Sequence, residues 1–487
     1  MVTARTSPPG FERFQFVAHA LNASGGFAPV VTSWMDDAGM VKPVSVAGEC
    51  YLVPYPRESE AKYAGRVAVA VYENHLRSAC ERFVGYLARK PPTRDNVDGP
   101  LAKGFVEDAD WRGNSLDVFW ANFMVDARAR GTMLVLLDTP ETLPATMAEQ
   151  VDRRAFPYLV AIPPERVESY ELDESCRFAR VRIHSTCDVD GKDVACIREW
   201  NADGWTVEVD GKVVKEGAHG FGRCPVLAFT ESTEFPTFGT FEQIAVLSRR
   251  IYNAHSELDE ILRSQTFSLL TFQVPADAAS TFDAAKVAAV IGTHNMLTHA
   301  GETPAFIAPP DGPATVYMQR IAALEAAIRR IGLDIEDTAS QSAESGLAKQ
   351  IRFQALNAAL GRFAMRMQDF ERQVWDLFAA AVNTENRVEV TWPTDYTLAD
   401  VVGELDKLTL MQSTGFSDLT LIEKRKQIAA AEFSSVDPDH LTELLDSLDE
   451  PAAEPKTPLD PASGTGLSND QNLGTQSDPP AGSGGAP

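Results

Sequence analysis

The sequence predicts an α+β protein that is mainly helical and ends in a disordered tail. Apolar residues recur at spacings of three and four through residues 353–377, which is the period of an amphipathic helix. Polar and apolar residues alternate in residues 180–184 and 205–209, as they do in half-buried strands. Residues 451–487 are rich in Pro, Gly and Ser and nearly lack apolar bulk, so burial cannot offset the entropy lost on ordering.

The N-terminal part is predicted to be mainly helical. Residues 60–87 contain no proline and carry apolar side chains at helical spacing, and the prolines at 91–92 end this helix. A second helix is expected at 114–130, with Gly131 as its C-cap. The apolar run at 132–137 follows directly and has the length of a buried strand.

Residues 158–230 are predicted to form an antiparallel meander. Asp-Gly pairs at 190–191, 203–204 and 210–211 supply the positive φ angles that tight hairpins require. The first pair lies in an Asp-rich stretch, 188–193, that superficially resembles a calcium loop. Its glycine comes too early in the stretch and strands flank it, so a hairpin turn is the favoured interpretation.

The C-terminal half is predicted to alternate between regular helices and polar connections. The expected elements are a helix at 241–267, short strands within a Pro- and Gly-interrupted region at 268–311, a helix at 312–333, a small acidic loop at 334–344, a long helix at 345–382, a strand at 387–392 and acidic helices at 398–448. At 1.5 Å per residue the long helix would measure about 57 Å.

Two apolar helix faces suggest an oligomer. The long helix carries a seam at 353–377, which we expect to pack against other long helices. The helix at 241–267 carries a second stripe through residues 244–262. Together they present more apolar helix surface than one copy is expected to bury, so the sequence predicts a closed oligomer.

The charge of the chain argues against tight binding of nucleic acid. The 44 Lys and Arg residues are outnumbered by 69 Asp and Glu residues, for a formal net charge of −25. Proteins that grip DNA by neutralising its phosphates carry the opposite sign. Residues 386–487 hold 6 basic and 18 acidic groups and so contribute −12 to the net charge. The alternative interpretation is therefore that the acidic residues only keep the protein soluble.

Signatures of catalysis and metal binding are missing from the sequence. It contains no P-loop, no Rossmann glycine motif, no nucleophile elbow and no zinc-protease motif. The six cysteines form no CxxC pair, which suits a reducing compartment. His255 lies on the apolar stripe and is interpreted as a packed histidine rather than a ligand. We therefore expect no enzyme, no cofactor and no bound metal.

Several short motifs stand out along the chain. They are Tyr51-Leu52-Val53-Pro54 with Glu58, Tyr63 and Arg66; Tyr72, Asn74, Arg77 and Gly85; Ala88-Arg89-Lys90-Pro91-Pro92; Gly222-Arg223-Cys224-Pro225-Val226; Phe272-Gln273-Val274-Pro275; and Glu344-Ser345-Gly346-Leu347-Ala348. In this order and spacing they resemble one group of tailed-bacteriophage portal proteins. The resemblance extends over residues 50–395. The acidic charge and the missing enzyme motifs agree with it.

The resemblance implies a portal-type ring subunit with wing, stem, clip and crown. The implied parts are a wing at 1–240, stem helices at 241–267 and 312–333, a clip at 268–311, a tunnel loop at 334–344, a long wing helix and strand at 345–396, a crown at 397–450 and a disordered tail at 451–487 without an assigned role. Portal proteins form a ring, commonly of about twelve copies, at one capsid vertex, through which double-stranded DNA is packaged and later ejected.

The resemblance also implies partners and a location. The expected partners are further copies of the chain, the terminase large subunit, the major capsid protein and scaffold, a head–tail adaptor, and double-stranded DNA that passes without sequence specificity. No membrane is involved. The chain would be assembled in the cytoplasm of a bacterial host and would lie at the portal vertex of the virion. The alternative is another head–tail connector or minor capsid protein without a DNA channel.

Two groups of residues are candidate contacts with DNA. The tunnel loop would present its acidic and small polar side chains to the channel, namely Asp334, Glu336, Asp337, Thr338, Ser340, Gln341, Ser342 and Glu344. The long helix carries a run of cations without an acid between Ser345 and Gln368, namely Lys349, Arg352, Arg362 and Arg366. These cations form either a solvated or inter-subunit face, or a contact with DNA or capsid.

Overall fold

The structure is a computed structural model of the chain. It describes residues 3–6, 11–35, 40–140, 144, 146–189, 191–266, 269–271, 305–307, 312–333, 346–396, 401–433 and 438–449. The chain divides into two compact units, Met1–Thr397 and Leu398–Pro487. The first unit mixes helices with antiparallel sheets, and the described part of the second is helical.

The N-terminal part of the first unit contains more helices than strands. Its elements are β1 (Thr3–Thr6), α1 (Phe11–Asn22), a 3-10 turn (Gly25–Phe27), β2 (Val30–Met35), β3 (Val41–Ala47), α2 (Glu60–Val69), α3 (His75–Ala88), β4 (Thr93–Asp95), α4 (Pro100–Glu107) and α5 (Leu116–Arg130). Helix α5 matches its prediction, since Ser115 caps its start and Gly131 ends it in the left-handed conformation at φ 79°. The hairpin β2–β3 was not predicted.

The single helix predicted at 60–87 is wrong, because residues 70–74 separate α2 from α3. The Asn74 side chain caps α3 by accepting a hydrogen bond from the Arg77 amide at 2.9 Å. Its amide nitrogen also donates to the Leu21 carbonyl at 2.8 Å, and the Tyr72 hydroxyl donates to the Ala20 carbonyl at 3.1 Å. Hydrogen bonds to the end of α1 therefore hold the link out of the helical conformation.

Two antiparallel sheets follow. Their strands are β5 (Thr132–Asp138), β6 (Tyr158–Ile162), β7 (Val167–Leu172), β8 (Phe178–Val189), β9 (Lys192–Trp200), β10 (Gly204–Val209), β11 (Lys212–Ala218) and β12 (Val226–Thr230); the short helix α6 (Met147–Asp152) precedes β6, and a 3-10 turn (Pro164–Arg166) precedes β7. The order β1-β7-β8-β9-β10-β11 contains the predicted meander. However, β6 and β12, which were predicted to belong to the meander, pair instead with the buried strand β5 in a separate sheet.

The Asp-Gly turns match their prediction in part. Gly191, Asp210 and Gly211 have φ angles of 74°, 50° and 76°. The pair at 203–204 does not supply a positive φ. Gly204 instead lies in β10, where an added Cβ would come within 2.2 Å of the Gly217 carbonyl oxygen, so this glycine allows two strands to approach closely.

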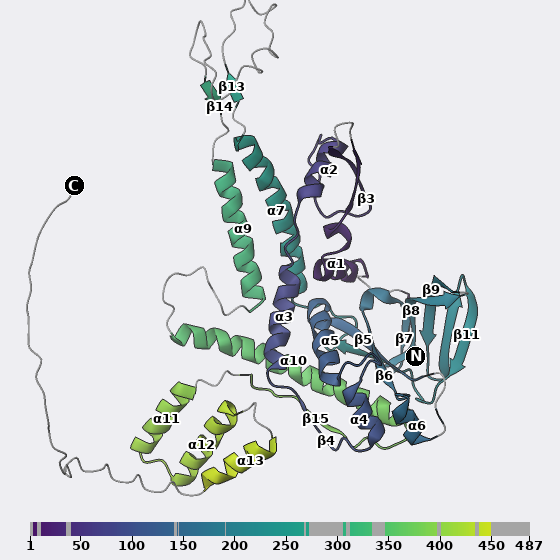
Figure 1. The fold of residues 1–487 in the computed structure, drawn as a ribbon, viewed down its shortest axis with the longest axis vertical. Helices are drawn as coiled ribbons and strands as arrows, with labels where there is room; N and C mark the ends of the chain where they lie inside the picture. The colour runs from purple at the N-terminus through teal and green to yellow at the C-terminus, as the bar shows by residue number, and fades with distance from the viewer. Residues whose placement is uncertain are drawn as a thin grey trace, which may run out of the picture. The chain divides into compact units, whose positions relative to one another are not determined.

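A pair of helices stands beside this core. Helix α7 (Glu242–Thr266) and helix α9 (Gly312–Ile331) lie side by side, and the short strands β13 (Leu269–Thr271) and β14 (Ala305–Ile307) pair beyond their common end (Figure 1). Both helices match their predicted ranges. Residues 272–304, most of the region predicted as the clip, lie outside the described residues.

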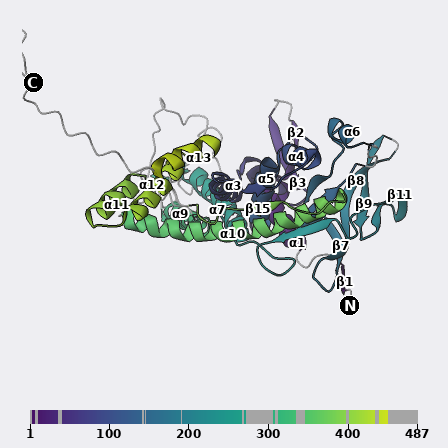
Figure 2. The same ribbon diagram turned by 90° about the horizontal axis from the view of Figure 1, so that it is seen from below.

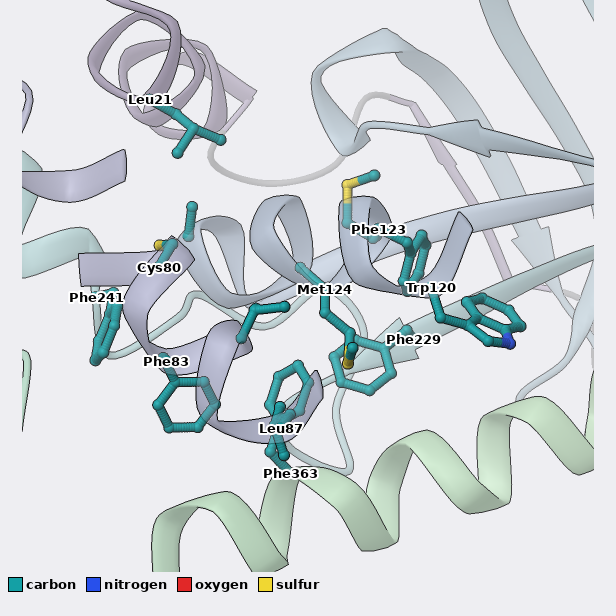
Figure 3. Close-up of a cluster of buried hydrophobic side chains, with 14 of the residues drawn as sticks. Leu21, Cys80, Phe83, Leu87, Trp120, Phe123, Met124, Phe229, Phe241 and Phe363 are labelled. Carbon is teal, nitrogen blue, oxygen red and sulfur yellow. The ribbon is translucent and has the colours of Figure 1, made fainter. Parts of the chain in front are cut away.

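The long helix α10 (Gly346–Ala381) crosses the first unit (Figure 2). Its apolar seam is covered by the same chain, with every seam residue from Leu356 to Leu377 at most 4% exposed. The rings of Phe363 and Phe370 meet Phe83 of α3, Phe123 of α5 and Phe229 of β12 at centroid distances of 5.2 to 5.7 Å. Figure 3 shows Phe363 of α10 among these side chains.

The seam of α10 therefore corrects two expectations. It packs against shorter helices and a sheet rather than against other long helices. Nor does it leave an apolar face that one copy cannot bury, and Ile244, Ile251 and Leu258 of the α7 stripe are buried as well. The physical reason is that β12 and β5, which were assigned elsewhere, lie under the same side of α10 as α3. An oligomer has to be argued from other surfaces.

The rest of the described chain agrees with the predicted elements. Strand β15 (Glu389–Thr391) lies within the predicted strand at 387–392 and pairs with β4 of the N-terminal part. The second unit contains α11 (Val401–Ser413), α12 (Asp418–Glu432), α13 (Pro438–Asp446) and a 3-10 turn (Ser447–Asp449). No described helix combines the length and apolar character needed to cross a membrane. The predicted tail at 451–487 lies outside the described residues.

Candidate functional site: the helix pair and the motifs that hold it

The first motif that resembles portal proteins, residues 51–66, contacts α7, and we call these contacts the clamp on α7. Arg66 of α2 donates two hydrogen bonds to the carboxylate of Glu58, each at 2.8 Å, and both side chains are at most 2% exposed. Arg66 also donates to the Ser256 hydroxyl of α7 at 3.0 Å and to the Val53 carbonyl at 2.9 Å. The hydrogen bonds from Arg66 hold the pKa of Glu58 below its ordinary value. The pair therefore stays charged and joins three segments.

The chain before Glu58 is attached to the same helix. The Asn253 side chain of α7 accepts a hydrogen bond from the Val53 amide at 2.8 Å and donates one to the Tyr51 carbonyl at 2.9 Å. The Tyr63 hydroxyl of α2 donates to the Leu52 carbonyl at 2.6 Å. Backbone groups of an irregular segment are thus satisfied by side chains from two helices, which fixes that segment along α7.

The second motif that resembles portal proteins, residues 72–85, joins α1 to α3. Asn74 and Arg77 both donate to the Leu21 carbonyl, at 2.8 and 2.9 Å, and so satisfy a terminal carbonyl of α1. The ring of Tyr72 stacks on Phe27 with centroids 3.9 Å apart, and both rings lie beside Tyr252 of α7. The motif residues are therefore architectural: they assemble α1, α2 and α3 around α7.

A third anchor holds the start of α7. Glu242 forms an ion pair with Arg13 of α1. Close by, the Arg128 guanidinium of α5 lies 4.3 Å from the ring of Phe83 and 4.1 Å from the ring of Phe241, and it donates to Glu231 at 2.7 Å. Burial raises the pKa of Glu231. The entry into α7 is thus fixed to the core by charge-assisted contacts.

Titratable groups gather where α3, α7 and α9 meet. Nε2 of His75 lies 3.3 Å from Glu73, and Nε2 of His255 lies 4.0 Å from the same carboxylate. Burial lowers the pKa of His75, against the opposing influence of Glu73 and of Glu325 on α9. Within the described residues, no group of three or more His, Cys, Asp or Glu side chains could hold a metal ion. His255 thus lies at an interface between helices.

The predicted DNA-contact residues are only partly described. All eight tunnel-loop residues, Asp334, Glu336, Asp337, Thr338, Ser340, Gln341, Ser342 and Glu344, lie outside the described residues. Lys349 and Arg352 fall in the first turns of α10, and their side chains are likewise not described. Arg362 is exposed, whereas Arg366 donates to the Ser232 carbonyl of the same chain at 3.2 Å. Arg366 is therefore engaged, at least in part, within its own chain.

The sequence analysis missed a hollow on the sheet side of the first unit. Its volume is about 1500 Å³, and its wall includes Trp111, Asp138, Tyr158, Arg198 and Trp205. The Trp111 ring stacks on Tyr158 at 5.0 Å, and the Tyr158 hydroxyl donates to Asp138 at 3.1 Å. Burial raises the pKa of Asp138. These residues come from separate loops and strands, so no local motif could have signalled them.

Among known proteins, no protein-family model and no curated protein matches the chain. The chain is similar to solved structures that share 12–13% of its residues. A virion structure of a native gene transfer agent particle is matched over 85% of this chain and 98% of that chain, with a TM-score of 0.42. A neck structure of the same kind of particle, with C12 symmetry, is matched over 72% and 88%, with a TM-score of 0.40.

A phage portal protein is also among the similar structures. It is an HK97-family portal protein from Corynebacterium diphtheriae, 12% identical over 68% of this chain and 93% of that chain, with a TM-score of 0.34. Portal proteins are the family that the sequence motifs of this chain resemble.

Proposed function

We propose that the chain is a portal subunit, which forms a ring at one capsid vertex through which double-stranded DNA is packaged and ejected. The observation that carries the proposal is the clamp on α7: the residues Tyr51 to Arg66, which resemble portal proteins in sequence, converge on one helix of the pair α7–α9. A residue set that fixes a helix pair in place is what a stem beside a channel requires.

In this proposal the helix pair is the stem, and its two ends meet different partners. Strands β13 and β14 at one end begin the clip, residues 268–311, which would dock the terminase large subunit and later the head–tail adaptor. The connection from α9 to α10, residues 334–344, would be the tunnel loop at the other end. The remaining parts would be a wing at 1–240 and 345–396, facing capsid protein and scaffold, and a crown at 397–450.

The charge of the chain supports passage of DNA without capture. DNA carries one negative charge per about 1.7 Å of its axis, so a basic channel would bind it through counterion release. A chain with a net charge of −25, and with Asp334, Glu336, Asp337 and Glu344 in the proposed tunnel loop, would instead repel the phosphates. Repulsion on all sides keeps the duplex centred and its movement free.

Electron microscopy of the purified full-length chain, combined with mass measurement, tests the proposal. We expect a closed ring with a central hole wide enough for a DNA duplex, and a mass that is a whole multiple of 53.1 kDa. A ring without a hole would instead indicate a connector that does not conduct DNA. A chain that stays monomeric at every concentration would contradict a portal altogether.

Docking of terminase to the clip is tested separately. Deleting residues 276–298 should leave the ring intact and should abolish terminase binding, since this deletion spares the stem helices and both described clip strands. A ring that lacks these residues and still packages DNA normally would contradict the assignment of the clip.

A further inference from the structure

The hollow on the sheet side of the first unit has two facing walls, and we call it the sheet hollow. Its volume is about 1500 Å³. The apolar core between the two sheets includes Trp200 of β9 and reaches Trp205 of β10, but it includes no residue of β11, a strand that the structure describes throughout. Strand β11 therefore overhangs the core, and the sheet hollow lies beneath it, opposite Asp138 and Tyr158.

Aromatic and cationic side chains share one face of the outer strands. They form two neighbouring rows across β9, β10 and β11, first Trp200, Trp205 and Gly217, then Arg198, Val207 and Lys215. Residues two apart on a strand point to the same side of a sheet, so both rows belong to one face. All of these residues line the sheet hollow. The register and the hollow thus agree that they form a single surface.

The two cations of this surface lack partners. The Nε atom of Arg198 is buried and makes no hydrogen bond, and neither Arg198 nor Lys215 forms an ion pair within the part of the chain that the structure describes. Both act electrostatically on the Cys187 thiol of β8, so the two side chains reach toward the same part of the hollow. A buried donor without an acceptor is unfavourable, and an anionic ligand between the two cations would supply the acceptor.

The acids around the hollow do not neutralise these cations. The carboxylate of Asp138 already accepts hydrogen bonds from the Tyr158 hydroxyl at 3.1 Å and from the next backbone amide at 2.9 Å. Burial raises the pKa of Asp138, against the opposing influence of these hydrogen bonds and of Arg198. Asp188 and Glu216 occupy the alternate strand positions, which face the other side of the sheet. The sheet hollow is therefore a positively charged site on a chain whose net charge is −25.

The mouth of the hollow offers backbone groups as well as charge. Strand β11 is the last strand of its sheet (Figure 1), and none of the described strands pairs with its outer side, so alternate amides and carbonyls point outward. An added Cβ on Gly217 would lie 2.8 Å from the Trp205 ring, so this indole reaches over the edge strand. Lys212 and Lys215 on β11 disfavour pairing with a basic strand and favour pairing with an acidic one.

A peptide fits these features better than other anionic ligands do. The volume exceeds the roughly 300–1,000 Å³ typical of small-molecule pockets. A nucleic acid could use the cations and the aromatic rings, but it has no peptide backbone to pair with β11, and a chain of charge −25 repels it. The backbone of an extended acidic peptide can pair with β11 while its side chains enter the hollow.

We propose that the sheet hollow binds an extended acidic segment of a partner protein, held along β11 with one carboxylate between Arg198 and Lys215. The recognised pattern is an acidic and an aromatic residue separated by one residue, because positions two apart on an added strand lie beside Lys215 and Gly217 on the same face. The aromatic side chain would meet Trp205. The inference goes beyond the proposed function and does not depend on it, since the whole hollow lies within one chain and a monomer would bind as a ring does.

Isothermal titration of the full-length chain with a synthetic peptide tests the proposal. The probe is the end-blocked heptapeptide Thr-Glu-Thr-Phe-Thr-Glu-Thr, which has the required pattern in both directions along a strand. Arg198→Met, with unchanged circular dichroism, should weaken binding at least about tenfold, as expected for a charge-assisted contact. Lys215 is exposed, so Lys215→Met should leave the fold intact and weaken binding by about two- to fivefold. The matched control is Arg372→Met on α10, which removes the same charge from an exposed site and should bind like the parental chain.

Two further probes separate the alternatives. The isomer Thr-Thr-Glu-Phe-Glu-Thr-Thr places its acids and its ring on opposite faces of an extended chain, so it should bind at least about tenfold more weakly. A single-stranded oligothymidylate should not displace the first peptide. The proposal is overturned if the parental chain binds neither peptide or binds both equally, if Arg198→Met and Lys215→Met bind like the control, or if the oligothymidylate displaces the peptide from the hollow.

Discussion

The long helix α10 and the hairpin β2–β3 both carry rows of apolar side chains, but the fold treats them in opposite ways. The seam of α10 is covered by its own chain from Leu356 to Leu377, where each seam residue is at most 4% exposed. The hairpin strands are 6 and 7 residues long, and they leave Trp34 and Met35 more than half exposed. The length and regularity of an apolar pattern therefore indicate where a core forms. They do not indicate which surface remains for a partner.

The largest difference between the two regions should appear in stability. Phe370 of α10 is 2% exposed and stacks on Phe123 at 5.5 Å. Phe370→Ala should lower the free energy of unfolding of the chain by about 3–5 kcal/mol, since the cavity cannot close fully. Trp34→Ala on the hairpin should change it by less than about 0.5 kcal/mol. Urea unfolding of both variants in the monomeric state measures this difference, and equal losses would contradict the comparison.

The clamp on α7 should respond to mutation and to pH. Arg66→Met leaves the Glu58 carboxylate buried without its partner, so a loss of about 3 kcal/mol or more is expected. Because the folded pKa of Glu58 is depressed, its contribution to stability is fully present above the ordinary pKa of 4.5 and is lost as the pH falls through the lower folded value.

A matched variant isolates the effect of Glu58. Glu58→Gln should remove this part of the acid destabilisation, so that its stability changes less between about pH 5 and pH 3, on either side of the ordinary pKa of 4.5, than that of the parental chain. Unfolding curves across this interval provide the measurement. The same slope in both proteins would show that Glu58 is not the responsible group.

A smaller effect is expected from His75 at the junction of α3, α7 and α9. Because burial lowers its folded pKa, stability should fall as the pH drops below the ordinary value of 6.5. The facing groups are Glu73, His255, Glu325 and Arg329, and the two carboxylates oppose this effect. His75→Gln should flatten the pH dependence of the melting temperature between pH 7 and pH 5, and His255→Gln is its matched comparison. An unchanged dependence in the His75 variant would contradict the assignment.

The tunnel loop should affect function without affecting stability. Replacing Glu336, Asp337 and Glu344 with Lys would turn repulsion of DNA into phosphate contacts, whose strength decreases with salt. We expect unchanged rings and slower or stalled packaging that added salt partly relieves. Packaging of a full genome at the parental rate in low salt would show that residues 334–344 do not meet DNA.

Local chemistry determined much of this protein directly. Ser115 and Gly131 mark both ends of α5, and the Asp-Gly pair at 210–211 turns β10 into β11. The spacing in residues 353–377 predicts α10. These features depend on neighbours within a few residues, namely caps, turn conformations and helical periodicity. The motif residues Glu58, Arg66 and Asn74 were also recognised in order, although nothing in their spacing indicated what they would contact.

Tertiary structure decided what lies against what. Only the folded chain shows that Asn74 and Tyr72 interrupt a continuous helical pattern by bonding to α1, and that β6 and β12 leave the meander to pair with β5. The seam of α10 is buried by α3, α5 and β12, which precede it by more than a hundred residues, while Trp34 and Met35 of the hairpin near the N-terminus stay exposed. Apolar burial is non-directional, so a sequence specifies which side chains avoid water, and the packing of distant elements determines which of them succeed.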